Sequence, residues 1–333
     1  MNWETLDWEV LDRLRETFLS DAKSAGPYWH TVSDLEAYNL TYGERIGWKW
    51  DAVLAELKRR AWAPPAGASV LDWGCGSGVA GRRVIDCFGT TAFTRLLVHD
   101  HSELAMDFAE HHGRKHYPGL DVRRAEVRFL RTDEPIGVLV ASHVLNELDD
   151  VARAELAGLC ARAETILWVE PGTHEASRAL GAWRGQLRAI GLNVVAPCPH
   201  QGACGVLAAG NERHWCHFFA SPPTSLYADS AWVKFGQRAG IDLRSLPYSF
   251  LALDRRTVAT RAGEACILGE PRHYKGYARI FNCDAVGVSE LMLQKRDAPE
   301  LFKALKQGAG PELHRWTHTN GRITAIEKPA PLP

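Results

Sequence analysis

The stretch that decides the fold is Val70-Leu71-Asp72-Trp73-Gly74-Cys75-Gly76-Ser77-Gly78, in which a short apolar run ends in three glycines at alternate positions. A Pro/Gly break precedes it and a helix-like segment follows it. Glycines at such a turn let backbone N–H groups approach a ligand, because no Cβ stands in the way. We therefore expect a strand, a cofactor loop and a helix, although a plain glycine-rich turn is the alternative. The residues that we place at the cofactor are Asp72, Gly74, Cys75, Gly76 and Gly78.

Beyond this loop, short apolar runs alternate with polar segments of helical length. Such alternation is typical of a parallel sheet with crossover helices. The runs that we expect to be strands are 69–72, 96–100, 126–130, 137–142, 165–170 and 192–196. Between them, residues 104–112 and 151–162 have the apolar spacing of helices. The sequence therefore predicts an α/β fold with a Rossmann-like sheet.

Three further segments surround or interrupt this sheet. Residues 1–62 have helical spacing and predict an N-terminal helical region. Residues 197–223 are rich in Cys, His, Gly and Pro and too irregular for a core element, so they predict a functional insertion within a main domain of residues 63–260. Residues 261–333 contain short β-like runs and predict a small C-terminal β-containing extension.

Two later turns complete the expected cofactor site. The run at 96–100 ends in Asp100, where folds of this kind receive ribose hydroxyls, and a carboxylate can accept both hydrogen bonds. The alternative for Asp100 is a helix N-cap, a position for which Ser102 competes. His143 follows the run at 137–142 and is expected at the far end of the cofactor. Asp133 is a candidate for the rim around the base.

Four cysteines have a distribution that suggests metal binding. Cys198, Cys204 and Cys216 lie in the insertion with the spacing Cys-x5-Cys-x11-Cys, and Cys283 follows a later apolar run. Four thiolates are a full ligand set for an iron–sulfur cluster or a structural zinc ion, and the spacing does not decide between them. Histidines that would allow a mixed zinc site are His200, His214 and His217. The remaining cysteines, which we expect to pack as small hydrophobic side chains, are Cys75, Cys87, Cys160 and Cys266.

Composition excludes several broad classes. The chain has 46% hydrophobic and 24% charged residues, as globular proteins do, and no run approaches the roughly 20 apolar residues of a membrane span. A net charge of -1 excludes a globally basic nucleic-acid binder but allows a local basic face. The acidic start at residues 1–9 lacks secretory and mitochondrial signals. We therefore expect a soluble protein of the bacterial cytoplasm that has reduced thiols and no membrane partner.

Four phrases in the chain carry a resemblance to a known family. They are Trp168-Val169-Glu170-Pro171-Gly172-Thr173, Pro197-Cys198-Pro199-His200, Trp215-Cys216-His217-Phe218 and Pro247-Tyr248-Ser249-Phe250-Leu251. In this order they resemble the mitochondrial small-ribosomal-subunit assembly methyltransferase-like family and its bacterial relatives, over roughly residues 35 to 300. The acid-led glycine loop is likewise similar to the methyltransferase nucleotide loop rather than to Gly-x-Gly-x-x-Gly.

The resemblance implies a class I (Rossmann-like) S-adenosylmethionine-dependent methyltransferase fold that carries a 4Fe-4S cluster. It also implies a role in maturation of the small ribosomal subunit through contact with its rRNA. The cluster ligands carry over to Cys198, Cys204, Cys216 and Cys283, and the cofactor loop to Asp72 through Gly78. The C-terminal extension would then complete the metal site. The acidic N-terminus departs from mitochondrial members and favours a bacterial relative.

No motif fixes a methyl acceptor. Methyl transfer from a sulfonium mainly requires alignment of donor and acceptor, and Ser142-His143-Val144-Leu145 stands where base-amine methyltransferases have an Asn/Asp-Pro-Pro-aromatic motif. His143, Glu147 and Glu170 are the candidates for orienting or deprotonating an acceptor, although His143 and Glu170 could also be structural. A role for Cys198 as a nucleophile on cytosine is disfavoured, because position 142 lacks the partner cysteine.

Three functions therefore stay open from the sequence. The first is an rRNA methyltransferase, and the second is a noncatalytic assembly factor that uses the fold and the cluster structurally. The third is a zinc-containing methyltransferase of small molecules. Evidence for RNA contact is a basic and aromatic group in the C-terminal third, for which a solvated surface is the alternative. Its members are Arg255, Arg256, Arg261, Arg272, His273, Tyr274, Lys275 and Tyr277.

Overall fold

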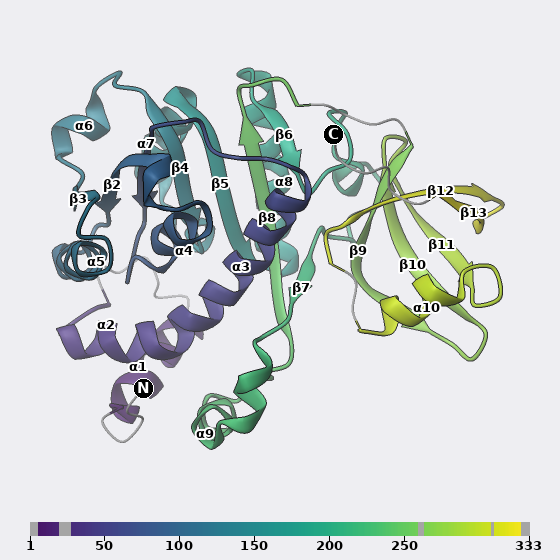
Figure 1. Cartoon of the computed structure of the whole chain (residues 1–333), viewed down its shortest axis with the longest axis horizontal. Coiled ribbons are helices and arrows are strands. Elements are labelled where there is room, and N and C mark those ends of the chain that lie inside the picture. Colours follow the sequence, from purple (N-terminus) through teal and green to yellow (C-terminus); the bar gives the residue numbers. More distant parts are fainter. Residues whose placement is uncertain (1–5, 20–27, 259–262, 308–309, 328–333) are drawn as a thin grey trace. The chain divides into compact units, whose positions relative to one another are not determined.

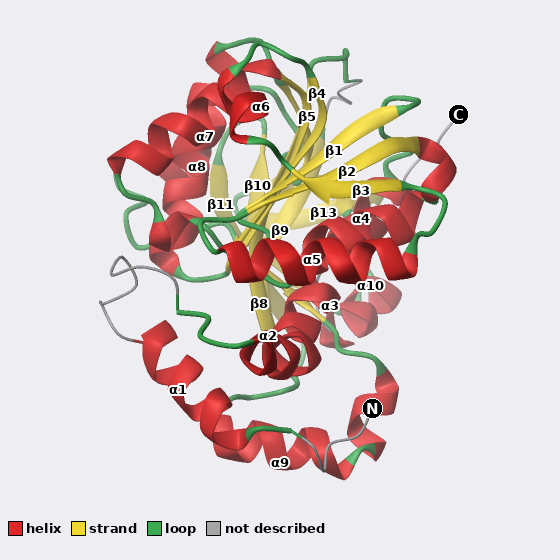
Figure 2. Ribbon diagram, turned by 90° about the vertical axis from the view of Figure 1, so that its left-hand side faces the viewer, coloured by secondary structure: helices red, strands yellow, loops and turns green. Residues whose placement is uncertain are grey.

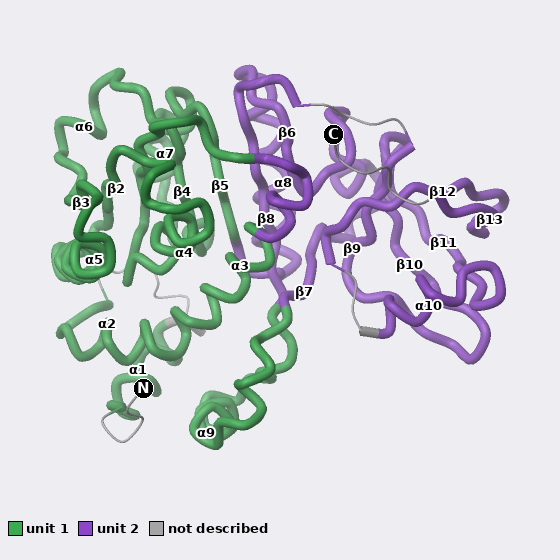
Figure 3. The backbone as a smooth tube through the Cα atoms, viewed as in Figure 1, with its two compact units in different colours: residues 1–54, 63–169, 221–246 green, residues 55–62, 170–220, 247–333 purple. Residues whose placement is uncertain are grey.

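The computed structural model describes residues 6–19, 28–258, 263–307 and 310–327. The chain divides into two compact units (Figure 3). Unit 1 comprises residues 1–54, 63–169 and 221–246, and unit 2 comprises residues 55–62, 170–220 and 247–333. Helix α3 and strand β5 each have residues in both units.

Unit 1 is built on a parallel sheet with the strand order β3-β2-β1-β4-β5 (Figure 1). The strands are β1 (Ala68–Trp73), β2 (Phe93–His99), β3 (Asp121–Arg124), β4 (Ile136–Ser142) and β5 (Ala163–Pro171). Strand β1 pairs in parallel with β2 on one side and with β4 on the other. Because β1 is central, its side chains are mostly apolar and buried, and its one carboxylate, Asp72, is buried with them.

Helices connect these strands, and Figure 2 shows α4 and α5 beside β1, β2 and β3. Their bounds are α4 (Val79–Phe88), α5 (Glu103–His116), α6 (Val127–Arg131) and α7 (Asp150–Arg162). The N-cap of α5 is Ser102, whose side chain accepts the N–H of Ala105 at 3.3 Å. Ser102, and not Asp100, is therefore the N-cap of α5.

The third strand differs from the expectation. The prediction of a strand at 126–130 is wrong, because Val127–Arg131 forms helix α6 and the strand β3 comes earlier. Strand β3 lies at the sheet edge, and Val122 is its one buried residue, so it has no apolar run. The apolar residues that suggested a strand instead form a helical turn, in which Phe129 is buried against the guanidinium group of Arg162, 4.9 Å from the ring centroid.

The N-terminal region is helical, as predicted. It contains α1 (Trp8–Leu19), α2 (Val32–Tyr38), a π-helical turn (Asn39–Gly43) and α3 (Glu44–Arg59). Leu14, Trp29 and Leu35 pack against Ala105 and Phe108 of α5, so this region is attached to unit 1 through α5. The later helix α9 (Ser230–Ala239) also belongs to unit 1, where Arg238 forms an ion pair of 2.7 Å with Asp12 of α1.

Unit 2 begins with helix α8 (His174–Ala189) and three strands. The strands are β6 (Asn193–Ala196), β7 (Phe218–Ala220) and β8 (Leu246–Asp254), and β8 pairs with β7 and, antiparallel, with β6. The β3-β2-β1-β4-β5 order, the glycine loop after β1 and an antiparallel strand late in the chain together define a class I methyltransferase fold. The predicted fold class is thereby confirmed.

The rest of unit 2 is a closed β-barrel of five strands in the order β10-β11-β13-β12-β9 (Figure 1). Its elements are β9 (Glu264–His273), β10 (Tyr277–Asp284), β11 (Val288–Gln294), α10 (Pro299–Ala304), β12 (Leu313–Thr319) and β13 (Arg322–Glu327). The barrel core contains Ile267, Ile280 and Leu293 from the strands, and Phe302 of α10 joins it. The predicted β-containing extension is thus a closed barrel.

Short 3-10 turns complete the structure. They are Thr90–Ala92, Leu145–Glu147, Gly205–Leu207, Thr224–Ala228 and Leu305–Gln307. Among the described residues, none of the helices has both the length and the apolar character that a membrane crossing requires.

Candidate functional site

The glycine loop connects β1 to α4 at the carboxyl end of the parallel strands in unit 1. The N–H groups of Gly74 and Cys75 both donate to the carbonyl of His99, at 2.8 and 2.9 Å. Gly74, Gly76 and Gly78 have φ angles of +70°, +50° and +75°, a region that L side chains rarely adopt. The loop is therefore held against the end of β2 in the tight turn that the sequence predicts.

The three glycines differ in what surrounds them. A Cβ on Gly74 would lie 2.6 Å from Cγ1 of Val144, and one on Gly78 would lie 2.9 Å from Cβ of Ala109. A Cβ on Gly76 would meet nothing within 4 Å. Gly74 and Gly78 are therefore required by packing, whereas Gly76 faces open space that a ligand could fill.

Asp100 lies directly after β2, is 6% exposed and closes this space on one side. Its Oδ2 accepts the N–H of Gly76 at 2.9 Å, and its Oδ1 accepts the N–H of Ser102 at 3.0 Å. Each carboxylate oxygen can accept a second hydrogen bond, so hydroxyl groups of a ligand could also bind there. This position beside Gly76 is the one that the sequence assigns to a ribose-binding acid.

Asp72 has a different position from the one expected for a ligand contact. It is completely buried, and its Oδ2 accepts the N–H of Gly81 in α4 at 2.9 Å. Burial raises the pKa of Asp72 to about 7, although the hydrogen bond from Gly81 acts in the opposite direction. We therefore expect Asp72 to fix α4 behind the glycine loop rather than to contact the cofactor.

His143 follows β4 with a φ of +59° and is enclosed by polar neighbours. Its Nε2 lies 3.2 Å from Nζ of Lys49, and its Nδ1 lies 3.3 Å from Oγ of Ser142, which also accepts the indole N–H of Trp50 at 3.0 Å. Burial lowers the pKa of His143 well below its usual range, and the Lys49 and Arg45 cations lower it further. The ring is thus neutral, and Nε2 is positioned to accept a hydrogen bond from Lys49.

Glu147 lies at the end of a 3-10 turn, near two tyrosines that the sequence analysis did not single out. Burial raises the pKa of Tyr28 and of Tyr38, and the Glu147 and Asp100 carboxylates raise both further. The pKa values of both tyrosines thus depend on the charges of Glu147 and Asp100. The one sequence signal was the run of aromatic residues in the N-terminal region, where Trp29 packs edge-on against Tyr38 at 4.9 Å.

The four predicted metal ligands all belong to unit 2. Burial raises the pKa of Cys216, and the thiols of Cys198, Cys283, Cys266 and Cys204 raise it further. Burial likewise raises the pKa of Cys283, with contributions from the same neighbouring thiols. These thiols therefore interact electrostatically, but in the described part of the chain they form no group that could hold a metal ion. The assignment of the four cysteines as metal ligands stays a prediction.

Cys266 also belongs to this group of thiols. It stands directly opposite Cys283 in the antiparallel register of β9 and β10, and it is 1% exposed. Its Sγ lies 3.7 Å from the carbonyl of Ile267 and 4.0 Å from that of Pro311. The sequence analysis predicted packing for Cys266, which its burial confirms, but could not place it beside Cys283 because strand register was unknown.

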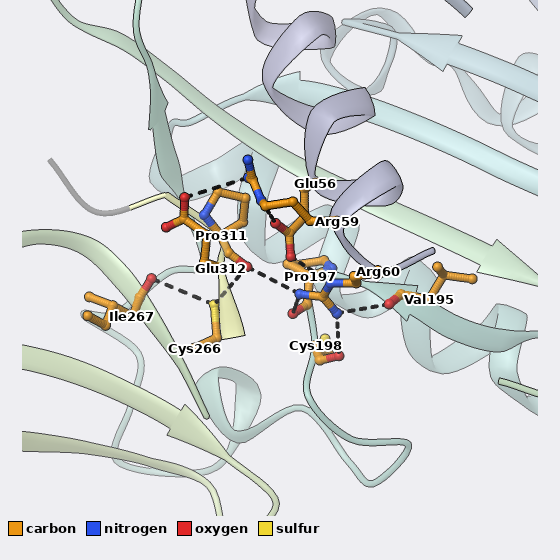
Figure 4. A network of polar contacts seen from close by, with 10 residues as sticks. All are labelled: Glu56, Arg59, Arg60, Val195, Pro197, Cys198, Cys266, Ile267, Pro311 and Glu312. Carbon is orange, nitrogen blue, oxygen red and sulfur yellow. Dashed lines mark hydrogen bonds and ion pairs between the residues drawn. The ribbon is translucent and has the colours of Figure 1, made fainter. Parts of the chain in front are cut away.

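An arginine holds the backbone around Cys198 (Figure 4). Nη1 of Arg60 donates to the carbonyls of Val195 and Cys198, at 2.9 and 3.3 Å. Nη2 of the same residue donates to the carbonyls of Pro197 and Pro311, at 2.9 and 3.2 Å. Glu56 balances the charge by accepting from Nε of Arg60 at 2.6 Å. The position of Cys198 is therefore fixed by a contact from the end of α3.

A second arginine, Arg184 of α8, contacts the sulfur of Cys198 itself. Its Nε lies 3.2 Å from Sγ of Cys198, and its Nη1 and Nη2 donate to the carbonyls of Gly202 and His200, at 2.9 and 3.1 Å. Arg184 is 3% exposed. Burial raises the pKa of the Cys198 thiol, and the Arg184 cation offsets only part of this rise.

The two metal centres predicted from the sequence are an iron–sulfur cluster and a structural zinc ion. Within the described ranges, no group of three or more His, Cys, Asp or Glu side chains stands ready to hold a metal ion. A thiolate-bound centre therefore stays a prediction from the sequence. The histidines have other partners, because His214 packs on Phe281 at 4.3 Å, His217 stacks on Trp215 at 4.6 Å, and Nδ1 of His200 accepts the N–H of Gly202 at 3.1 Å.

Several other expected residues have positions that bear on their roles. Asp133 is exposed and precedes β4, at the amino ends of the parallel strands and thus opposite the glycine loop, so its assignment to the base rim is wrong. Burial raises the pKa of Cys198, which argues against a free nucleophilic thiolate. Glu170 is completely buried in unit 2, and its catalytic role stays a prediction.

The basic group that was expected to contact RNA separates into two parts. Arg255 donates to the carbonyl of Ile190 at 3.0 Å, and Arg256 forms an ion pair of 2.5 Å with Asp254, so both are engaged at the end of β8. Arg261 lies outside the described residues. The remaining members, from Arg272 to Tyr277, lie on the barrel.

Two solved structures are distantly similar to this chain. Among solved structures, the chain is similar to magnesium protoporphyrin IX methyltransferase from Synechocystis PCC 6803 with bound S-adenosylmethionine, with 13% identity, a TM-score of 0.40 and coverage of 76% of this chain and 99% of that one. It is also similar to an O-methyltransferase family protein from Burkholderia thailandensis, with 16% identity, a TM-score of 0.39 and coverage of 77% and 71%. We base the fold class on strand order rather than on these distant likenesses. No curated protein matches the sequence.

A family model matches most of the chain, over residues 36–310. Its description is mitochondrial small ribosomal subunit Rsm22. The matched range contains the glycine loop, Asp100 and all four cysteines of the predicted metal site. The chain therefore belongs to the Rsm22 family, as the resemblance in its sequence indicated.

Proposed function

We propose that this chain binds S-adenosylmethionine in unit 1 and acts on the small ribosomal subunit as a methyltransferase-like protein. The observation that carries the proposal is the open space at Gly76, which the Asp100 carboxylate borders while it holds the Gly76 N–H. Tight glycine turns of this kind, followed by an acid after the second strand, receive the nucleoside part of a cofactor. The family name supports the small ribosomal subunit as partner.

S-adenosylmethionine would supply an electrophilic methyl group, so the protein has to align an acceptor and exclude water. His143 suits a positioning role in such a site, because Lys49 lies 3.2 Å from its Nε2 and Ser142 lies 3.3 Å from its Nδ1. Glu147 is a better candidate to orient an acceptor, since it lies with Tyr28 and Tyr38 near Asp100. We propose rRNA as the acceptor or binding partner.

Calorimetric titration with S-adenosylmethionine tests the cofactor site. Gly76→Ala places a methyl group in the open space, and we expect it to weaken binding at least tenfold while the protein stays folded. Gly210→Ala is the matched control, because Gly210 also has a positive φ, +86°, and open space around its Cβ position, but lies in unit 2. Equal affinity of both variants and the wild type for S-adenosylmethionine would contradict the proposed site.

We further propose that Cys198, Cys204, Cys216 and Cys283 hold a 4Fe-4S cluster, with zinc as the alternative. The gathered thiols and the buried Arg184 beside Cys198 support thiolate ligands. The histidines of the insertion are engaged elsewhere, which disfavours mixed zinc ligation. Such a centre would join the insertion to β10 and stabilise unit 2.

Iron, acid-labile sulfide and zinc content of protein purified without oxygen test this assignment. We expect matched iron and sulfide in the wild type and a marked loss in Cys216→Ser. Cys87→Ser is the control, since Cys87 is a half-buried cysteine of α4 in unit 1. Colourless wild-type protein with one zinc ion per chain would indicate a zinc site instead of a cluster. Unchanged metal content in Cys216→Ser would contradict the ligand assignment.

Methyl transfer and structural assembly are distinguished by labelled-methyl incorporation into immature small subunits. Incorporation that Gly76→Ala abolishes would establish an rRNA methyltransferase. Binding to the subunits without incorporation at saturating cofactor would establish the noncatalytic assembly factor, which the engaged Nε2 of His143 favours. Absence of binding to small subunits would favour a methyltransferase of small molecules.

A further inference from the structure

The C-terminal barrel has a topology with a recognisable binding face. Neighbouring strands in its closed order are antiparallel, except that β11 pairs in parallel with β13. Helix α10 lies in the chain between the third strand, β11, and the fourth, β12. This arrangement is that of the oligonucleotide/oligosaccharide-binding fold. In that fold, ligands bind across the second and third strands, beside the turns that follow the first and fourth strands.

The corresponding face here is the outer side of β10 and β11. Along β10, Ala278 and Ile280 enter the barrel core, so Tyr277, Arg279 and Phe281 belong to the outer side. The ring of Phe281 packs on His214 of the insertion, which covers the end of the face that carries Cys283. Arg279 is exposed, so the other end of the face is open to a ligand.

Two stacked tyrosines border this open end. Tyr274 follows β9, Tyr277 begins β10, and their rings are 4.6 Å apart and inclined by 11°. The N–H of Tyr274 donates to the carbonyl of Tyr277 at 2.8 Å, which fixes the turn between them. Tyr274 is nevertheless 42% exposed. A fixed ring with an open face is a platform on which a nucleic-acid base can stack.

Basic side chains surround the tyrosines. Glu290 of β11 pairs with Arg272 and, at 3.1 Å, with Arg279, which aligns the two guanidinium groups on adjacent strands. The N–H of Lys295 donates to the carbonyl of Gly276 in the same turn at 2.9 Å. The cations near this turn are Arg272, Lys275, Arg279, Lys295 and Arg296, against the carboxylates of Glu290 and Asp297. The open end therefore has an excess of positive charge.

The turn between the fourth and fifth strands reaches the same face. The carbonyl of Gly321 in this turn accepts the N–H of Met292 at 2.8 Å. Met292 of β11 stands opposite Arg279 of β10 and also opposite Arg322 of β13. Both turns that border ligands in this fold therefore lie along the face that carries Tyr277 and Arg279.

We propose that this face binds single-stranded RNA, with bases stacked on the Tyr274–Tyr277 pair and phosphates held by Arg272, Lys275 and Arg279. Single strands are favoured over duplexes because a duplex hides the faces of its bases. The excess of cations favours a polyanion over an oligosaccharide. This inference deepens the proposed function by assigning its RNA contact to the barrel, but it is independent of S-adenosylmethionine and of the metal centre.

The test is fluorescence anisotropy of the full chain, purified without oxygen, with a labelled oligouridine of about 12 nucleotides, within the usual site size of such folds. Replacing Tyr274 and Tyr277 together by Ala should weaken binding about 10- to 100-fold, as loss of base stacking does. Tyr227→Ala is the matched control, because Tyr227 is 55% exposed in unit 1 and should leave binding unchanged. Lys275→Ala should lower the slope of log K against log salt by about 0.7.

Three results would overturn the proposal. They are unchanged affinity in the double tyrosine variant, an equal loss in Tyr227→Ala, and tighter binding of the corresponding duplex. S-adenosylmethionine binding and iron content are measured on the same variants and should equal the wild-type values. Failure of the barrel assignment is thereby distinguished from failure of the proposed function, for which Gly76→Ala and Cys216→Ser are the tests.

Discussion

Replacing the buried Asp72 by Asn should change how the free energy of unfolding depends on pH. Asp72 is inaccessible to solvent, and its Oδ2 accepts the N–H of Gly81 at 2.9 Å. Burial raises its pKa from 3.8 to about 7. Asp72→Asn keeps the shape and an acceptor for Gly81 but has no charge at any pH. The variant therefore isolates the cost of burying the ionised carboxylate beneath α4.

The sign follows from proton linkage. Between about pH 4 and pH 7 the folded wild type binds a proton that the unfolded chain has released, so its stability falls as the pH rises through this window. The stabilisation is complete below the unfolded pKa and lost above the folded one. A difference of about three in pKa, at about 1.4 kcal/mol for each, gives about 4 kcal/mol in total. About 3 kcal/mol of this lies between pH 5 and pH 8.

Urea unfolding at about pH 5 and about pH 8 measures the effect. The free energy of unfolding of Asp72→Asn, relative to wild type, should rise by about 3 kcal/mol between these pH values. Asp254→Asn should show no such change between these pH values, because hydrogen bonds from Arg256 and Trp62 outweigh burial and lower the pKa of Asp254, so its linkage lies below about pH 4. Parallel pH profiles of wild type and Asp72→Asn, within about 0.5 kcal/mol, would refute a raised pKa at Asp72.

Two further predictions concern the polar neighbours of His143 and Cys198. Lys49→Met removes the cation 3.2 Å from Nε2 of His143, so the pKa of His143 should rise in an NMR titration, and an unchanged pKa would contradict this contact. Arg184→Gln removes a buried cation and the N–H directed at the sulfur of Cys198, so the reduction potential of the proposed cluster, where it is bound, should become more negative. A midpoint equal to that of the wild type, at equal iron content, would exclude a role for Arg184 beyond packing.

The sequence predicts those parts of the fold that have a local signal. Strands β1, β4 and β5 are continuous apolar runs because they are buried on both faces, and the glycines after β1 are required by positive φ angles. Strand β3 was missed because an edge strand with one buried residue has no apolar run. The barrel was predicted only as β-like runs, since its closure depends on pairing between strands that are far apart in the chain.

The same distinction applies to the candidate site. Gly76 and Asp100 follow directly after strands, so their place at the carboxyl edge was predictable from topology. The cysteines were predictable from their residue type and from the resemblance. Tyr28, Tyr38 and Lys49 were not, because they come from the N-terminal region, whose packing no motif encodes.

In unit 2, the proposed metal centre would connect an irregular insertion to a closed barrel. Cys198 and Cys216 come from an insertion with little regular structure, whereas Cys283 stands on β10 of a barrel that has its own apolar core. Arg60 and Arg184 already hold the Cys198 backbone and sulfur in place. A bound centre would therefore add the missing link between the insertion and the barrel, by closing a long loop of chain. The covered end of the β10 face would then be a structural anchor, which leaves the opposite end, with Tyr277 and Arg279, available to RNA.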